Sequence, residues 1–194
     1  MDSGNELGLW KKYQDRTANG KLRPLVVEAL EQVTRRDSAL DLGAGALNDT
    51  AYLLEQGFKE VIAVDLTQPY KPLSPGTDQH YKYVRTRFEN YEFPSAHFDF
   101  VSAQFSLPFT GQEHFGNVWS SVLASLRSGG IFAGQLFGVR DDWFGRSGIV
   151  FHSAEEMVGL AGGLSLLKSE EREYTEKSER GKHWHYYDLI LKKS

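Results

Sequence analysis

Two acidic residues and two glycines, each placed where an apolar run ends, are the residues of this sequence best suited to chemistry. One apolar run contains Asp41 and leads into Gly43 and Gly45, and a second apolar run ends at Asp65. Glycine lets the backbone pass close to a ligand because it has no β-carbon. A carboxylate at the end of the following strand can accept both hydroxyls of a ribose. The spacing predicts strand, turn, helix and strand, the arrangement that binds an adenosine-bearing cofactor.

Each half of this pattern also has a purely structural explanation. Many strand-to-helix turns use glycine with nothing bound, and Asp65 alone can cap the turn that follows it. The cofactor interpretation depends on the glycine pair and Asp65 occurring together at this spacing.

The residues after the second glycine discriminate between cofactors. A dinucleotide site has a third glycine three positions beyond Gly45, where the pyrophosphate lies over the helix N-terminus. Here that position is Asn48, and Asp49 follows it. An acid in the first turn suits the helix dipole but repels a pyrophosphate. A cofactor with a positive sulfur and an amino-acid tail meets no such repulsion, and S-adenosylmethionine fits this description.

Apolar periodicity and turn residues predict alternating helices and strands, as in a mostly parallel α/β sheet. Pro24 suits the first turn of a helix, and Ser128-Gly129-Gly130 is expected to end another. The predicted helices span about 6–16, 24–35, 48–56, 112–127 and 153–161. The predicted strands span about 38–43, 60–65, 81–85, 97–105 and 130–138.

The C-terminal third predicts a different connection. Two strand-like runs, about 164–175 and 182–192, are joined only by Glu176 to Gly181. So short a connection cannot carry a crossover helix, and the two strands must therefore pair antiparallel. A dehydrogenase sheet normally ends in parallel strands, so this hairpin also argues against a dinucleotide enzyme.

Composition excludes several classes of function. The 194 residues suit one domain, and the net charge of −4 without a basic stripe argues against a nucleic-acid surface. Cysteine is absent, which excludes disulfides, thiolate zinc sites and a cysteine nucleophile. No apolar run approaches the ~20 residues of a membrane span, and the polar start lacks a secretory pattern. We expect a cytoplasmic protein that does not associate with membranes; its oligomeric state is not predicted.

These segments resemble the class I S-adenosylmethionine-dependent methyltransferases over nearly the whole chain. Asp41-x-Gly43-x-Gly45 is similar to the first motif of the family, and Asp65 to its ribose-binding acid. The run 98–105 resembles the fourth strand, and 126–130 resembles the turn before the fifth. The runs 48–54 and 181–185 resemble the small tellurite-resistance-type branch.

The resemblance implies a Rossmann-like methyltransferase fold, α/β, with a seven-stranded, mostly parallel sheet and helices on both faces. The implied strand order is 3-2-1-4-5-7-6, with strand 7 antiparallel. We expect residues 1–194 to form one domain, in which helices within residues 1–35 form a lid over the cofactor. The family often has a third glycine two residues after Gly45, where this chain has Leu47.

The resemblance also implies a set of cofactor contacts. Asp41 would lie near the cationic amine, Asp65 would hold the ribose and Leu66 would pack on the adenine, while Arg23 could meet the carboxylate of the cofactor. Tyr13 is equally compatible with packing at i, i+3 spacing from Trp10. The full predicted set is Tyr13, Arg23, Asp41, Gly43, Ala44, Gly45, Asp65, Leu66, Arg87, Phe88, Gln104 and Phe105.

Acceptor contacts are expected from Phe105 to Phe109, from the N-terminal segment and from the loop Gly138 to His152, which is long for a connector. We identify no catalytic residue with certainty, and Asp141, Trp143 and His185 are candidates on the acceptor side. His183 and His185 share one face of a predicted strand, but no third ligand lies at recognisable spacing, so no metal site is predicted.

The predicted function is methyl transfer from S-adenosylmethionine to a small molecule by in-line displacement, since little of the chain is left for a substrate-recognition domain. Two alternatives stay open. The first is a protein that binds the cofactor without catalysis, and the second is an NAD(P)-dependent oxidoreductase. The acceptor and its reacting atom are not predicted.

Overall fold

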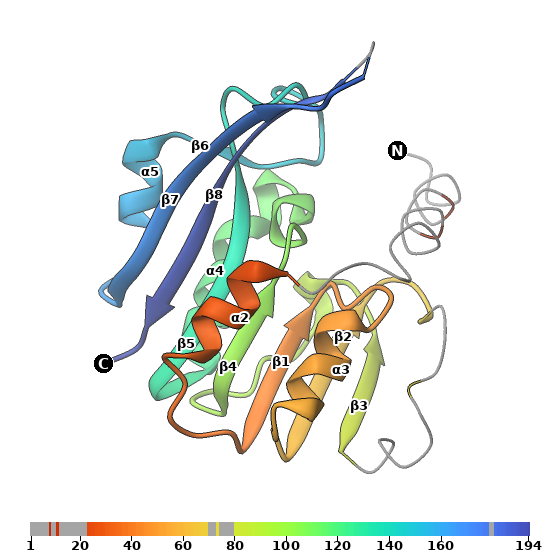
Figure 1. Cartoon of the computed structure of the whole chain (residues 1–194), viewed down its shortest axis with the longest axis vertical. Helices are drawn as coiled ribbons and strands as arrows, with labels where there is room; N and C mark the ends of the chain where they lie inside the picture. The colour runs from red at the N-terminus through yellow and green to blue at the C-terminus, as the bar shows by residue number, and fades with distance from the viewer. Residues whose placement is uncertain (1–7, 9–10, 12–22, 70–72, 74–79, 179–180) are drawn as a thin grey trace.

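The computed structural model describes residues 8, 11, 23–69, 73, 80–178 and 181–194, and within them it forms one twisted sheet with helices on both faces (Figure 1). The strands are β1 (Ser38–Leu42), β2 (Glu60–Asp65), β3 (Tyr81–Arg85), β4 (Phe98–Ala103), β5 (Leu126–Gly138), β6 (Phe151–His152), β7 (Ser165–Thr175) and β8 (His183–Lys192). The helices are α2 (Pro24–Leu30), α3 (Asn48–Glu55), α4 (Gln112–Ser125) and α5 (Ala154–Gly159), with 3₁₀ turns η1 (Phe88–Asn90) and η2 (Leu107–Thr110).

The strand order is β3-β2-β1-β4-β5-β8-β7, and β8 pairs antiparallel with both β5 and β7. The order and the reversed strand inferred from the resemblance are therefore confirmed. The strand count is wrong by one, because β6 pairs with Phe137 and Gly138 of β5. Strand β4 ends at Ala103, opposite Gly134. Beyond that point β6 pairs in parallel with the free end of the longer β5.

Apart from the predicted helix 6–16, most of which lies outside the described residues, the predicted strands and helices are present, and helix 24–35 ends early at Leu30. One further difference is instructive. Helix α4 ends at Ser125, and Ser128-Gly129-Gly130 lie inside β5 rather than at the end of the helix. The register with β4 shifts here from Phe98–Leu126 to Phe100–Ile131, and Gly129 has φ +78°. The glycines therefore form a β-bulge, a feature with the same local composition as a helix stop.

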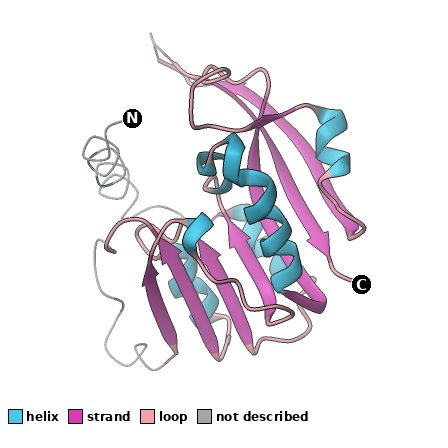
Figure 2. Cartoon of the chain, turned by 180° about the vertical axis from the view of Figure 1, so that it is seen from behind, coloured by secondary structure: helices cyan, strands magenta, loops and turns pink. Residues whose placement is uncertain are grey.

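Two apolar clusters fill the two faces of the sheet. Helices α2 and α3 cover one face (Figure 1), where buried residues of α2 pack with the strands beneath it. Helices α4 and α5 cover the other face (Figure 2), and the indole of Trp119 donates a hydrogen bond to the Leu160 carbonyl. The buried central strands β1 and β4 are continuous apolar runs apart from a few polar residues, as expected for parallel strands covered on both faces.

Helix α2 packs on the sheet through Leu25, Val26, Ala29 and Leu30, which are buried, and Arg23 before it lies near Phe105. The lid expected from helices within residues 1–35 stays a prediction, since residues 1–22 except Gly8 and Lys11 lie outside the described residues.

Buried Asp99, on β4, fixes the start of β1. Its carboxylate accepts hydrogen bonds from the backbone N–H groups of Asp37 (2.8 Å) and Ser38 (3.1 Å) and from the side chains of Arg35 and Arg127. Backbone donors that lose a buried acceptor keep the full cost of their desolvation.

We expect Asp99→Ala to lower the free energy of unfolding by about 2–4 kcal/mol, because the N–H groups of Asp37 and Ser38 lose their acceptor. Urea unfolding at pH 7 measures this. The matched control is Lys59→Ala, which removes an exposed ion pair with Asp37 and should cost less than about 1 kcal/mol. Equal effects of the two substitutions would contradict this account of β1.

Candidate functional site

The predicted site residues converge where β1, β2 and β4 end. Because these strands are parallel, their carboxyl ends lie at one edge of the sheet. The turn after β1 is bonded directly to β2, since the N–H groups of Gly43 and Ala44 both donate to the Val64 carbonyl at 2.8 and 3.2 Å. Alignment of the strand ends therefore positions the predicted motif without a ligand.

Gly43 is required by a close approach within the protein. It has φ +80°, and an added Cβ would overlap the Ser106 Cβ. The Ser106 hydroxyl donates to the Leu42 carbonyl at 2.6 Å, which holds the turn after β4 against the turn after β1. The sequence interpretation assigned this glycine to ligand clearance, whereas the structure shows that clearance of Ser106 already requires it.

Gly45 and Asp65 contact each other directly. Gly45 has φ +49°, and its N–H donates to Asp65 Oδ2 at 2.9 Å. Asp65 Oδ1 accepts from the N–H and the hydroxyl of Thr67 at 2.8 and 2.7 Å. Asp65 therefore caps its own turn and also supports the glycine turn. A carboxylate has about four acceptor positions, so Oδ2 keeps capacity for one more donor, such as a ribose hydroxyl.

Asp41 is buried beneath the glycine turn. Thr50 Oγ1 donates to its Oδ2 at 2.6 Å. Burial, with the neighbouring charges of Asp49 and Asp65, raises the pKa of Asp41 to about 8. Burial also raises the pKa of Asp49 to about 6, and the nearby guanidinium of Arg23 opposes this shift. Three carboxyl groups thus share one region, and the low polarity favours the protonated form of Asp41.

The start of α3 offers no anion site. Leu47, at the N-cap, adopts φ +64°, and Asp49 occupies the first turn. A side-chain carboxylate at a helix N-terminus is stabilised by the helix dipole and repels a second anion there. Leu47 thus takes the left-handed conformation that a third glycine of the motif would adopt easily.

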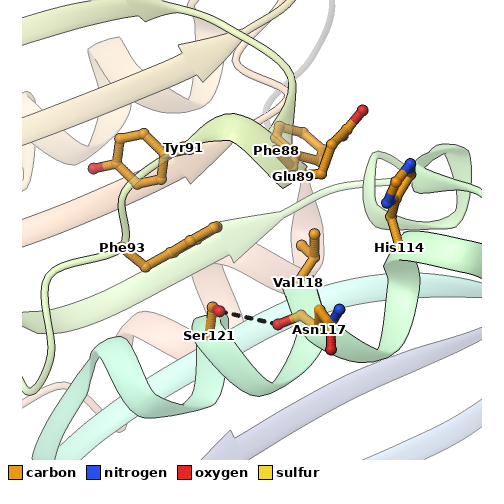
Figure 3. Close-up of a pocket in the computed structure, with 8 residues that line it drawn as sticks. All are labelled: Phe88, Glu89, Tyr91, Phe93, His114, Asn117, Val118 and Ser121. Carbon is orange, nitrogen blue, oxygen red and sulfur yellow. Dashed lines mark hydrogen bonds between the residues drawn. The ribbon is translucent and has the colours of Figure 1, made fainter.

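The three residues predicted to contact adenine follow β2 and β3, whose ends are joined by the hydrogen bond from Thr86 N to the Asp65 carbonyl (3.0 Å). Leu66 stays near β3, because its carbonyl accepts from Arg85 Nε at 3.2 Å, and Arg87 immediately precedes η1. Phe88 lines a pocket of about 130 Å³ between η1 and α4 (Figure 3). Its other lining residues are Glu89, Tyr91, Phe93, His114, Asn117, Val118 and Ser121. None of them belongs to the turns after β1 and β2, so this pocket is separate from the cluster of acids.

Gln104 and Phe105 follow β4 as predicted. The Gln104 amide donates to Ser102 Oγ and the Ala133 carbonyl, both at 3.1 Å, and this turns the side chain toward the sheet. Phe105 has φ +55°, which is unusual for a large residue and marks a constrained turn. The Arg23 guanidinium lies 5.5 Å from the centre of the Phe105 ring. The structure therefore brings Arg23, Asp49 and Phe105 together, whereas Tyr13 lies outside the described residues.

Of the three acceptor-side candidates, Asp141 and Trp143 lie near Phe105. Phe137 lies between Phe105 and Trp143: its ring centre is 5.9 Å from that of Phe105 and 5.7 Å from that of Trp143. Asp141 is buried, and its carboxylate accepts from Trp143 N (2.9 Å), His185 N (3.1 Å) and Lys182 Nζ (2.8 Å). Asp141 thus organises the loop that carries Trp143.

The surroundings of His185 argue against its predicted role as an acceptor-side base. Its ring is buried against Gly138, on the sheet face opposite Trp184. Its Nδ1 accepts from Arg140 N at 2.9 Å, and its Nε2 lies 2.7 Å from Glu171 Oε1. Both nitrogens take part in bonds that join the loop to the hairpin. Among the described residues, no three His, Asp or Glu side chains form a metal-binding group.

Sequence reasoning missed Thr50, Ser106 and Lys182. Thr50 and Ser106 carry no local signal, since a hydroxyl in a turn or helix is common. Lys182 does carry a signal in the sequence. It alternates with Trp184 and Tyr186, so an extended chain places all three on one face.

Comparison with known proteins identifies the class. Residues 40–134 match the family described as methyltransferase domain. A 1,6-didemethyltoxoflavin N1-methyltransferase from Burkholderia thailandensis has 24% identity and a TM-score of 0.69, over 89% of this chain and 77% of that chain. TehB from Haemophilus influenzae has 15% identity and a TM-score of 0.73, over 95% and 67%. The N-methyltransferase NodS from Bradyrhizobium japonicum has 14% identity and a TM-score of 0.63, over 95% and 98%. No curated protein matches the sequence.

The fold is that of the Rossmann-like methyltransferases, as the resemblance of the sequence implied. The match over residues 40–134 identifies a methyltransferase domain, and the predicted alternative of an NAD(P)-dependent oxidoreductase is set aside. The similarity to TehB supports the predicted branch at the level of the fold. Over the part of the chain that the structure describes, no helix is long and apolar enough to cross a membrane.

We expect Gly43→Ala to destabilise the protein by about 2 kcal/mol or more, because alanine is strained at φ +80° and its Cβ overlaps Ser106. Thermal and urea unfolding measure the change. The double variant Gly43→Ala/Ser106→Gly should recover part of the loss, since it removes the overlap and keeps the strain. If the double variant loses as much stability as the two single variants added together, the contact with Ser106 does not explain why position 43 requires glycine.

The buried Asp41 predicts how stability depends on pH. Its folded pKa of about 8 exceeds the usual 3.8, so between these values the folded state binds more protons than the unfolded state. The free energy of unfolding of the ligand-free protein should therefore fall as pH rises from 4 to 8. In Asp41→Asn this decrease between pH 5 and pH 8 should be smaller by at least about 1 kcal/mol. Identical pH profiles from urea titrations of both proteins would contradict the assignment.

Proposed function

We propose that the chain binds S-adenosylmethionine above the ends of β1, β2 and β4 and transfers its methyl group to a small molecule. The observation that carries the proposal is the group of carboxyls around the glycine turn. Asp41, Asp49 and Asp65 lie together there, and each charge acts to keep its neighbours protonated, with Arg23 as the opposing cation among the described residues. Such a region favours a ligand that brings positive charge.

S-adenosylmethionine brings an ammonium and a sulfonium, whereas a dinucleotide brings two phosphates. An opposite charge within several ångströms favours the ionised form of a buried acid. The ammonium of the cofactor would thus stabilise Asp41 as a carboxylate. This interaction would offset the cost of burying the carboxylate and so favour binding. A pyrophosphate at the same place would oppose ionisation of Asp41 and Asp49.

The remaining predicted residues are assigned to the other parts of the cofactor. Asp65 Oδ2 would accept a ribose hydroxyl while Gly45 N–H holds it in place. Leu66 and Arg87 would lie beside the adenine. Arg23 would bind the carboxylate of the amino-acid tail, and Phe105 would lie beneath the methyl group.

The cofactor supplies an activated methyl group on a positive sulfur. The protein then has to align donor and acceptor for in-line displacement and to exclude water. A base is needed only for an acceptor that must lose a proton. Transfer can therefore proceed although both nitrogens of His185 are bonded to Arg140 and Glu171. Aromatic residues near Phe105 provide the dry surroundings that such a transfer requires.

One structural neighbour supports a small-molecule acceptor, and two support the cofactor. The Burkholderia enzyme is described with bound 1,6-didemethyltoxoflavin and S-adenosylhomocysteine, and NodS with S-adenosylhomocysteine. The net charge of −4 argues against a nucleic-acid acceptor. A cytoplasmic location is part of the proposal.

Calorimetric titration tests the cofactor. We expect S-adenosylhomocysteine to bind and NAD to give no signal. Asp65→Asn should weaken binding about tenfold, because it replaces the ribose acceptor and weakens the bond to Gly45. The matched control is Glu60→Gln, an exposed acid at the other end of the same strand, which should bind like the wild type. Binding of NAD, or equal affinity in all three proteins, would contradict the proposed site.

Turnover tests catalysis against the alternative of binding without transfer. A library of small acceptors, incubated with the protein and S-adenosylmethionine, is assayed for released S-adenosylhomocysteine. We expect at least one acceptor to give release that Asp65→Asn reduces. Cofactor binding without release from any acceptor would favour the non-catalytic alternative.

A further inference from the structure

Lys182 occupies a cation-binding cage made by the protein itself. Its ammonium lies 3.2 Å from the centre of the Trp184 ring and 3.9 Å from that of Trp143. Asp141 Oδ2 accepts from it at 2.8 Å. The Lys182 side chain is 13% exposed, and the carboxylate of Asp141 is fully buried. Two aromatic faces and a carboxylate around an ammonium are the features by which proteins bind organic cations.

The groups facing the cage come from several elements. Burial lowers the pKa of Lys182, while Asp141, Asp142 and Glu176 oppose this shift. Phe137, on β5, lies behind the ammonium at 5.3 Å. The charge of Lys182 is therefore balanced within the protein, and its ammonium occupies the position that a second cation would need.

This cage lies beside the expected methyl position. Phe105 contacts Trp184 at 6.1 Å and Tyr186 at 4.9 Å between ring centres, and it contacts Phe137 as well. The Trp184 ring thus contacts both Lys182 and Phe105.

The surroundings of Phe105 are aromatic and positively charged. Phe105, Trp184 and Tyr186 are only partly buried, so part of each ring stays accessible. Arg23 lies over Phe105, and Lys182 lies over Trp184. Partly exposed rings bind flat aromatic molecules by stacked or edge contacts. The two nearby cations disfavour a positively charged one.

We propose that Lys182 is a specificity-determining residue: its ammonium fills the cage of Trp143, Trp184 and Asp141, so that the enzyme accepts planar aromatic molecules without positive charge. The proposal rests on the proposed function, because it concerns the acceptor side of the same site. A tethered ammonium is present at high effective concentration, so a free cation cannot compete for the cage. A neutral or anionic ring does not have to displace the Lys182 ammonium, because it would bind beside the cage and not in it.

The test compares two probes with the same ring system and opposite charge, 2-naphthoate and 2-naphthyltrimethylammonium. Calorimetry first confirms that each protein binds S-adenosylhomocysteine, and the probes are then titrated into the saturated protein. Failure at the first step counts against the proposed function, and failure only at the second counts against this proposal.

In the wild type, we expect 2-naphthoate to bind at least about tenfold more tightly than the cation. Lys182→Met keeps the length of the side chain and removes its charge, and it should reduce this preference about tenfold or reverse it. The control is Lys168→Met, which removes another partly buried lysine of the same hairpin, paired with Glu28 and Glu170. Its preference should equal that of the wild type.

Should Lys182→Met fail to fold, Lys182→Arg and Lys182→Gln provide the same comparison. Arginine keeps the charge and should keep the preference for naphthoate, and glutamine should lose it. The proposal is overturned if the wild type binds the cation as tightly as naphthoate, if it binds neither probe, or if removing the charge leaves the preference unchanged.

Discussion

The site depends on the close approach of two turns, the one after β1 and the one after β4. Gly43 lies against Ser106 with no room for a side chain, and its N–H is bonded to the Val64 carbonyl of β2. The Gly43 N–H and the Ser106 hydroxyl thus hold three strand ends close together. Because the backbone fixes these positions, Asp41 and Asp65 are oriented before any ligand binds.

This arrangement leaves an electrostatic imbalance at its centre. Asp41 is buried, with hydrogen bonds from the hydroxyl and the backbone N–H of Thr50, and Asp49 and Asp65 lie nearby. Proteins seldom bury an acid in this way unless a ligand or partner compensates for it, and perturbed acids cluster at functional sites. The same imbalance favours a cationic cofactor over a pyrophosphate, which agrees with the sequence arguments from Asn48, Asp49 and the final hairpin.

The two faces of the long hairpin of β7 and β8 have different roles. On one face, Arg140 joins Glu171 and Glu173, and His185 is bonded into the same network. On the other face, Lys182 and Trp184 meet the loop residue Trp143. One face therefore fixes the loop, and the other presents aromatic residues toward the strand ends. Alternation along a strand explains why neighbouring residues such as Trp184 and His185 have unrelated roles.

The sequence by itself determined the order and type of the elements, the reversed last strand and the edge of the sheet at which the site lies. These follow from local rules, since periodicity, turn residues and the short link 176–181 act over a few residues. Only the tertiary structure decided that Gly43 avoids Ser106, that His185 serves the fold and that Lys182 fills an aromatic cage. It also decided that Ser128-Gly129-Gly130 form a bulge rather than a helix stop. Each of these depends on contacts between residues far apart in the chain, and spacing along a sequence carries no information about which distant side chain will lie across a turn or a strand.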